Sequence, residues 1–292
     1  MSPSAVVRAL RPRHWAKNVF VFAPLVFALR LGEGDAVLRA LAAFGIFCAL
    51  SSAVYLVNDL ADREQDRLHP KKRDRPIAAG EVSPGFAAGL AAVLGIGGLA
   101  ASSPLGAPFA AVAAAYLVLN LAYSMGLKQV VILDVMIVAA GFLLRAGGGA
   151  LAVGVEISHW LILCTGLLAL FLGFVKRRQE LGAAYGAGQP TRPILQEYTP
   201  EFLDQMISVV TASTVVCYSL YAFSPEVAEK LGTRHLGLTL PFVLFGIFRY
   251  LYLVHRRGQG ENPTRLVFTD PPLVVNVALW GAAVLVVLYV WR

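Results

Sequence analysis

The residues best suited to chemistry form a polar stretch, Asn58 to Asp66, that directly continues a long apolar run. At about 100° per residue, Asp59, Asp62 and Asp66 are expected to share one helix face, with Asn58 beside them. Acids on one face repel each other, and helix packing does not require them. Hard oxygen ligands at this spacing suit Mg²⁺, which often shares its coordination with a substrate diphosphate. The stretch therefore predicts a magnesium site; the alternative is a charged helix end at a membrane surface.

Cations follow these acids within ten residues and would hold the phosphate charge that the metal leaves. Lys72 and Arg73 are the members of this run predicted to bind substrate. Because a residue before proline is biased away from helix, Arg75-Pro76 is expected to fold the basic residues back over the acids. Tyr55 is nearly in line with Asp62, about two turns deeper, and is predicted to line the same cavity.

A second polar cluster lies between the fourth and fifth apolar runs, where Asn120, Tyr123, Ser124 and Lys128 precede Asp134. A glycine between the runs allows a tight turn, so this segment is expected to be a helical hairpin with its polar tip on the inner side. Asp134 has valine at the positions four residues away on either side. A second metal site of the D-x-x-x-D kind is therefore incomplete.

Arg145 is eleven residues beyond Asp134, about 20° away around the helix and roughly 16 Å deeper. An arginine at such depth needs a partner or a wet cavity. Two interpretations remain open: a structural pair with an acid such as Glu156, and an anion ligand at the bottom of the cavity that the acids line. The glycines that follow, Gly147 to Gly149, allow close helix packing or a local break.

Composition identifies a polytopic membrane protein. The chain has 292 residues, of which 57% are hydrophobic and 15% charged, and its mean hydropathy is +0.65. These values exclude an ordinary soluble domain. Nine apolar stretches are expected to span the membrane, roughly at 18–32, 37–58, 85–102, 107–125, 130–152, 158–175, 206–224, 236–254 and 272–291.

The formal net charge of +7 is explained by topology and gives no reason to expect nucleic acid. With the amino terminus inside, most Lys and Arg fall in inner segments, and this asymmetry predicts a cytoplasmic amino terminus and an active site facing the cytoplasm. Lys17 borders the first apolar run on that side and is a candidate phosphate ligand. The run Lys176 to Arg178 is mostly a topology signal, although Lys176 is predicted to reach the cavity. No cysteine pattern indicates a disulfide or zinc.

The combination of motifs resembles the UbiA superfamily of intramembrane prenyltransferases. An N-D-x-x-D-x-x-x-D helix end runs into a basic R-P loop, and a Y-S-x-x-L-K hairpin is followed by an acid. More narrowly, five segments resemble the decaprenyl-phosphate phosphoribosyltransferase branch, and the likeness covers nearly the full chain. These segments are Arg11–Asn18, His69–Arg73, Tyr123–Lys128, Lys176–Leu181 and Phe245–Tyr250.

The resemblance implies an all-α bundle, residues 1–292 as a single domain, around a central cavity open sideways to lipid in the inner (plasma) membrane. It implies Mg²⁺ and a diphosphate at the inner surface. Asn58 and Asp62 would be metal ligands, with Asp66 and Asp59 in support and Asp134 assisting catalysis. The side chains expected to hold substrate phosphates are Lys17, Tyr55, Lys72, Arg73, Tyr123, Lys128, Arg145 and Lys176.

The incomplete second acidic cluster suits a donor with an extra phosphate, such as phosphoribosyl diphosphate, and an acceptor that is itself a lipid phosphate. The resemblance thus implies transfer of 5-phosphoribose to a polyprenyl phosphate, for synthesis of a cell-envelope arabinose donor. The alternative is transfer of a polyprenyl group from its diphosphate to an aromatic or other small acceptor. A transporter is disfavoured because the acids cluster at one membrane face and no inverted repeat is apparent. Exposed small-residue faces permit a homo-oligomer.

Overall fold

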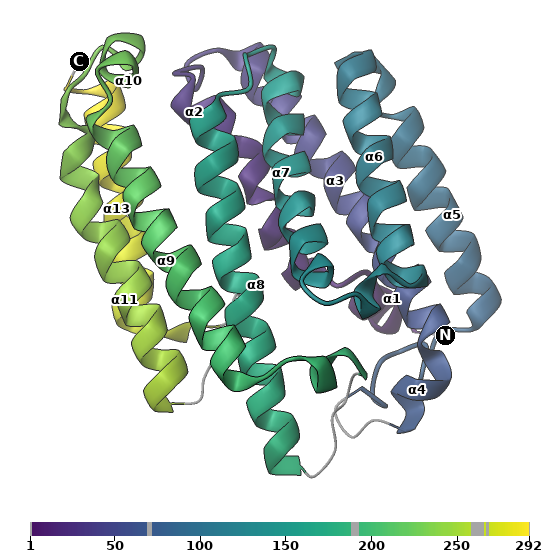
Figure 1. Ribbon diagram of the computed structural model, residues 1–292. Coiled ribbons are helices and arrows are strands. Elements are labelled where there is room, and N and C mark those ends of the chain that lie inside the picture. The colour runs from purple at the N-terminus through teal and green to yellow at the C-terminus, as the bar shows by residue number, and fades with distance from the viewer. Residues whose placement is uncertain (1, 69–71, 188–192, 258–265, 267–268, 292) are drawn as a thin grey trace. The chain divides into compact units, whose positions relative to one another are not determined.

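The computed structural model describes residues 2–68, 72–187, 193–257, 266 and 269–291, and every regular element in them is helical (Figure 1). The chain forms two compact units, which are described separately. The first comprises Met1–Leu25, Glu33–Ile137 and Gly141–Glu156, and the second comprises Val26–Gly32, Val138–Ala140 and Ile157–Arg292. The single domain expected from the sequence stays a prediction.

The first unit is built around α3 (Gly34–Ala61), which contacts α1, η1, α5 and α6. Phe47 and Leu50 of α3 pack with Phe109 and Tyr116 of α6 in a buried core. The elements that carry most of this unit are α1 (Pro3–Leu10), η1 (Pro12–Phe22), α2 (Ala23–Phe27), α4 (Arg63–Leu68), α5 (Pro84–Ala100), η2 (Ser103–Leu105), α6 (Ala107–Met125), η3 (Leu127–Gln129) and α7 (Leu133–Val153). Because α3 and α7 are the most enclosed of the long helices, polar groups at their ends are held on a rigid support.

The second unit packs α8 against α9 and α11 against α13, around a core that includes Tyr218, Leu236 and Leu288. The Tyr218 hydroxyl lies 2.7 Å from Thr239 Oγ1 and accepts from Trp280 Nε1 at 3.2 Å. The elements of this unit are α8 (His159–Ala187), η4 (Pro193–Glu197), α9 (Pro200–Phe223), α10 (Pro225–Leu231), η5 (His235–Thr239), α11 (Leu240–Arg257) and α13 (Pro271–Tyr289).

Several helices begin with a capping side chain followed by proline. Ser83 accepts from the Phe86 N–H, and Pro84 occupies the first turn. Thr199-Pro200 and Asp270-Pro271 repeat the arrangement at α9 and α13. The side-chain oxygen satisfies a backbone N–H that the helix leaves unpaired, and proline has no N–H to satisfy. The start of α5 near Ser83-Pro84 is thus as the sequence predicts.

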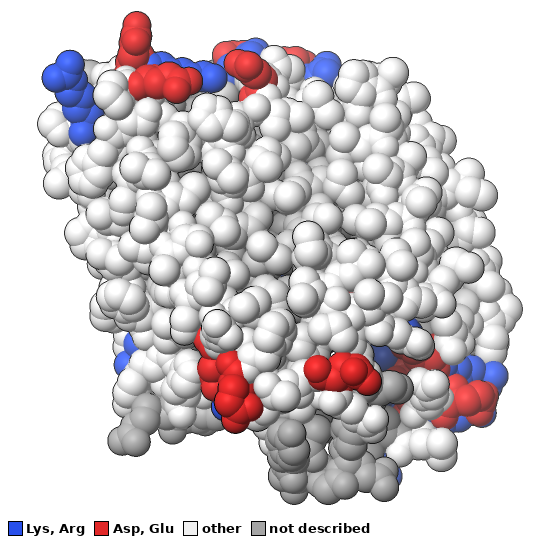
Figure 2. Space-filling model, in the orientation of Figure 1, with Lys and Arg blue, Asp and Glu red and all other residues white. Residues whose placement is uncertain are grey.

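Eight helices among the described residues are long and apolar enough to cross a membrane. The predicted count of nine is not confirmed, because residues 18–32 form the end of the 3₁₀-helix η1 and the short helix α2 in place of one long helix. Leu29 has φ of 62°, a left-handed conformation in which an α-helix does not continue. On the face shown in Figure 2, charged side chains gather toward helix ends and the stretch between them is uncharged.

The glycines after Arg145 bring α7 against neighbouring segments of its own unit. A β-carbon added at Gly149 would lie 2.1 Å from the backbone oxygen of Val21 in η1. At Gly148 it would lie 2.9 Å from the ring of Phe47. The close packing expected of these glycines is therefore confirmed for Gly148 and Gly149, and at Gly149 the neighbour is main chain.

Candidate active site

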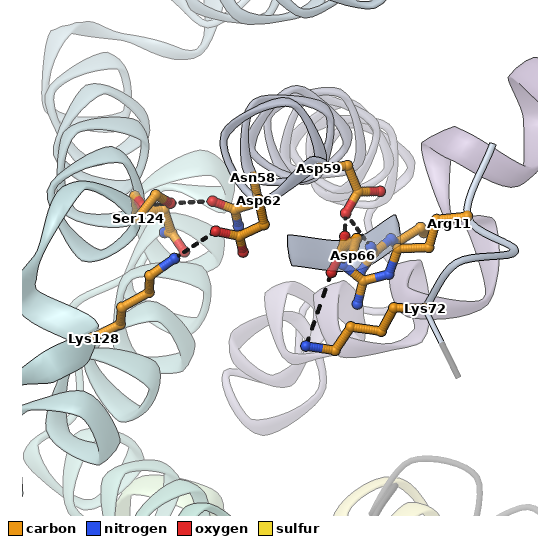
Figure 3. A network of polar contacts seen from close by, with 10 residues as sticks. Arg11, Asn58, Asp59, Asp62, Asp66, Lys72, Ser124 and Lys128 are labelled. Carbon is orange, nitrogen blue, oxygen red and sulfur yellow. Dashed lines mark hydrogen bonds and ion pairs between the residues drawn. The ribbon is translucent and has the colours of Figure 1, made fainter. Parts of the chain in front are cut away.

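The acidic stretch lies where α3 ends. The last residue of α3 is Ala61, Asp62 is its C-cap, and α4 begins at Arg63. The single face expected for the acids is not kept, because on the regular part of the helix Asp62 lies closer to Asn58 (about 40°) than to Asp59 (about 60°). Figure 3, which looks along α3, shows Asn58 and Asp62 on one flank of this helix end and Asp59 and Asp66 on the other.

The first flank joins α3 to the polar hairpin between α6 and α7. Ser124, near the end of α6, hydrogen bonds to Asn58 Oδ1, and Lys128 Nζ in η3 lies 3.0 Å from Asp62 Oδ1 (Figure 3). The Asp62 and Lys128 side chains remain 31% and 28% exposed, so both can be reached by a ligand. The sequence predicts only that the hairpin tip and the acidic stretch lie on the same side of the apolar runs; the contacts made by Ser124 and Lys128 come from the structure.

The second flank is a cluster of buried acids and less buried cations. Arg11 Nη2 donates to Asp59 Oδ1 at 2.5 Å. Arg75 Nη1 bridges the two acids, at 3.1 Å from Asp59 Oδ1 and 2.6 Å from Asp66 Oδ2. Lys72 Nζ lies 4.0 Å from Asp66 Oδ1. The basic segment therefore folds back over the acids as expected.

The sequence missed two members of this second flank, Arg11 and Arg75. It selected Arg73, which is exposed, although Arg75 belongs to the same basic segment. The signal that favours Arg75 is the proline after it, because a residue before proline is biased away from helix, and the chain bends at Arg75 within a run of turns. His69, Pro70 and Lys71 lie outside the described residues.

Arg145 is buried among neutral groups. Its Nε donates to Asn18 Oδ1 at 2.6 Å, Nη1 to the Gly141 carbonyl at 2.8 Å, and Nη2 to the Tyr116 hydroxyl at 2.6 Å. Its guanidinium also lies 4.6 Å from the centre of the Tyr116 ring. The structural interpretation is therefore supported, with neutral partners in place of Glu156. Because these contacts leave the positive charge without a carboxylate partner among the described residues, Arg145 makes the interior of this unit electropositive.

Lys17 lies within reach of that positive field. Burial, together with the smaller effects of the nearby charges of Arg145 and Arg11, lowers the pKa of its ammonium group to about 8. Arg11 also covers Tyr55, whose ring centre is 4.9 Å from the guanidinium carbon. A cation with a lowered pKa next to other cations is a site at which an anion would bind favourably.

The remaining predicted residues are placed as follows. Asp134 is fully buried in the first turn of α7, where the helix dipole favours a carboxylate. Tyr123 is half-buried near the end of α6. Lys176 belongs to the second unit, where its Nζ lies 3.7 Å from Glu180 Oε1 on the same helix. The incomplete second acidic cluster is thus represented by one buried acid and by Lys128.

The helices and this polar site define a multi-pass helical membrane protein with a charged site at the end of α3. The chain belongs to the UbiA prenyltransferase family, whose profile matches residues 19–270. It is 36% identical to decaprenyl-phosphate phosphoribosyltransferase of Mycolicibacterium smegmatis, over 96% of this chain and 92% of that protein. It is 34% identical to the enzyme of the same name from Corynebacterium glutamicum, over 98% and 87% of the two chains.

A solved structure supports the fold. The UbiA homolog from Archaeoglobus fulgidus, determined with DMAPP and Mg²⁺, matches with a TM-score of 0.74 over 98% of this chain and 99% of that one. The two sequences are only 20% identical, so the likeness extends to the arrangement of the helices and no further. The all-helical fold expected from the resemblance is confirmed.

Proposed function

We propose that the protein transfers 5-phosphoribose from phosphoribosyl diphosphate to a polyprenyl phosphate and releases diphosphate. The observation that carries this proposal is the contact between Lys128 and Asp62 at the first flank. A prenyl diphosphate donor would suit a second cluster of acids at this position, and the chain has a cation there instead. Arg11, Arg75 and Lys72 add further positive charge at the second flank. Such a surplus suits a donor and an acceptor that both carry phosphate. The nearly full-length relatives bear the name of this activity.

The first flank fits a hard divalent cation. Asn58 Oδ1 and the half-exposed Asp62 carboxylate offer oxygen ligands, and Ser124 Oγ hydrogen bonds to Asn58 Oδ1. No group of three or more His, Cys, Asp or Glu side chains in the described part of the chain could hold a metal alone. A site with few protein ligands suits Mg²⁺, which keeps waters and takes substrate phosphates. When bound there, Mg²⁺ would supply charge neutralisation for the leaving diphosphate.

The remaining catalytic work is positioning and charge stabilisation. The acceptor phosphate oxygen forms a bond to the anomeric carbon as the bond from that carbon to the diphosphate breaks. Because a phosphate monoester is already nucleophilic at neutral pH, no strong general base is required. Lys128 and Lys17 would hold the phosphate charges of the substrates. The excess of Lys and Arg on this side of the spans supports a site that faces the cytoplasm of a cell with its lipid acceptor in the inner membrane.

A labelling experiment with two donors tests the proposal. Membranes that contain the protein are given radiolabelled phosphoribosyl diphosphate or radiolabelled prenyl diphosphate, with and without a metal chelator, and the lipids are extracted. We expect label in lipid from phosphoribosyl diphosphate, abolished by the chelator. Label that enters product only from the prenyl donor would replace the proposal with prenyl transfer to a small acceptor.

The lowered pKa of Lys17 gives a pH dependence. If the ammonium form binds a donor phosphate, the substrate finds less of that form as pH rises through about 8, the pKa of the free protein. We expect kcat/KM to fall by about tenfold per pH unit above this value. Lys17→Arg should remove this descending limb because arginine stays charged across the range. A limb that persists unchanged in the arginine variant would assign it to another group.

A further inference from the structure

The acids of the motif divide between two environments at the end of α3. Asp62 is half-exposed beside Lys128, whereas Asp59 and Asp66 are only 2% exposed and are paired with Arg11 and Arg75. Figure 3 shows the two pairs of acids on opposite sides of the helix end. A carboxylate that is to take a metal from solution must be accessible. The buried acids are instead already bound by guanidinium groups, so their contacts are those of a support for the cations above them.

The cations of the second flank are accessible. The side chains of Arg11, Arg75 and Lys72 are 20%, 28% and 26% exposed, so the outer side of the cluster is positive. Arg11 contacts Asp59 through Nη2 alone, and Arg75 contacts both acids through Nη1 alone. A guanidinium has further N–H donors in a fixed plane, and this geometry matches the oxygens of a phosphate.

The two flanks lie on either side of one helix end (Figure 3). Asn58 and Asp59 are consecutive residues, and an α-helix with its side chains is about 10–12 Å across. A ligand that binds at both flanks must therefore carry two anionic groups on a short, polar spacer. A pentose with a diphosphate at C1 and a phosphate monoester at C5 has this form, whereas a prenyl diphosphate carries its charge at one end only.

We propose that Arg11 and Arg75 bind the phosphate monoester of the donor, while the flank of Asn58, Asp62 and Lys128 takes its diphosphate. Asp59 and Asp66 are then positioning residues, which hold the two guanidinium groups in place and do not bind the metal. This inference rests on the proposed function and names the residues that would select a phosphorylated pentose over a prenyl chain. Lys72 adds positive charge beside Asp66.

Two separate probes test the division, with purified full-length protein in lipid nanodiscs and equilibrium binding by calorimetry. Ribose 5-phosphate carries only the phosphate monoester of the donor, and magnesium diphosphate carries only its diphosphate group. We expect Arg75→Gln to lower the affinity for ribose 5-phosphate by about tenfold or more, because a charge-assisted contact is lost at the second flank. The affinity for magnesium diphosphate should fall by less than about twofold, because the first flank is unchanged. Lys128→Gln should show the reverse pattern.

Arg8→Gln is the matched control, because Arg8 is an exposed inner-side arginine that pairs with Glu81. It should leave the binding of both probes unchanged. Arg75→Lys keeps the charge and serves if the glutamine variant has a lowered melting temperature. The lysine variant should still lose affinity for ribose 5-phosphate because an ammonium group lacks the planar pair of N–H donors that a guanidinium group offers to a phosphate. Equal losses for both probes in either Arg75 variant, or no loss for ribose 5-phosphate, would overturn the subsite.

The role of Asp66 has its own readout, the binding of Mn²⁺ followed by electron paramagnetic resonance. Asp66→Asn should lower the affinity for ribose 5-phosphate and leave the affinity for Mn²⁺ unchanged. Asp62→Asn should lower the affinity for Mn²⁺. An equal loss of Mn²⁺ affinity in the two variants would make Asp66 a metal ligand and overturn its positioning role. If the unaltered protein binds neither ribose 5-phosphate nor phosphoribosyl diphosphate, the proposed function itself fails. Binding of both without any effect of Arg75 or Arg11 contradicts the subsite alone.

Discussion

Asp62→Ala is expected to lower kcat/KM by at least about 100-fold and to leave the helices folded. The carboxylate is the half-exposed oxygen donor of the first flank, and losing an interaction that orients a metal typically costs on the order of 10- to 100-fold, with a direct ligand costing more. Its ion pair with Lys128 is partly solvated, so its loss should change the free energy of unfolding by less than about 1 kcal/mol. Phosphoribosyl transfer and thermal unfolding by circular dichroism measure the two effects.

Asp35→Ala is the control for the Asp62 variant. Asp35 is an exposed aspartate in the first turn of the same helix, at its opposite end. It removes the same charge from α3 without touching the candidate site, so kcat/KM should stay within about twofold, since a surface charge at a helix terminus contributes only about 0.3–1 kcal/mol to stability. Full magnesium-dependent activity in Asp62→Ala would show that the metal is held elsewhere.

The meeting of the acidic stretch and the hairpin was predictable because both are local signals. Polar residues that end two apolar runs on the same side are expected at one membrane face, and the two segments do meet, through Ser124 with Asn58 and Lys128 with Asp62. The division of the acids is consistent with the helical period. At about 100° per residue Asp62 lies about 40° from Asn58, whereas Asp59 and Asp66 lie about 20° from each other and Asp59 lies about 60° from Asp62. The expected shared face treats these angles as one surface, and the cations that contact Asp59 and Asp66 come from other segments, which periodicity does not place.

The partners of the buried charged residues could not be predicted from neighbouring residues in the sequence. Arg11 is 48 residues from Asp59, and Arg145 is 127 residues from Asn18, so each contact depends on how separate segments return to α3 and α7. Depth in the membrane correctly indicated that Arg145 needs partners. Because opposite charges attract, the sequence predicts an acid as the partner. The chain uses an amide, a hydroxyl and a carbonyl oxygen instead, and these satisfy the donors without cancelling the charge.

Gly149→Ala is expected to be the most damaging single-methyl change in the first unit. The new carbon would lie 2.1 Å from the Val21 oxygen and 2.8 Å from the Val21 carbonyl carbon, and these atoms are main chain that no rotamer change can move. Overpacking of this kind costs about 3 kcal/mol. We expect the melting temperature in nanodiscs to fall by on the order of 10 °C. The 3₁₀-helix η1 must shift, and it carries Lys17 and Asn18, so activity should fall even at temperatures at which the variant stays folded.

The control is Gly97→Ala, since Gly97 is an exposed residue inside α5 where a β-carbon meets nothing within 4 Å. There the added methyl group only restricts the unfolded backbone, and helix propensity favours alanine by up to about 1 kcal/mol, so stability should be equal or slightly higher. The pair separates contact with Val21 from any general effect of replacing glycine in a helix. If both variants melt at the same temperature, α7 and η1 are not in the close contact that places Lys17, and the electropositive interior of the site would need another explanation. If only Gly149→Ala melts early and also loses its dependence on pH near 8, the position of Lys17 is linked to the α7 backbone.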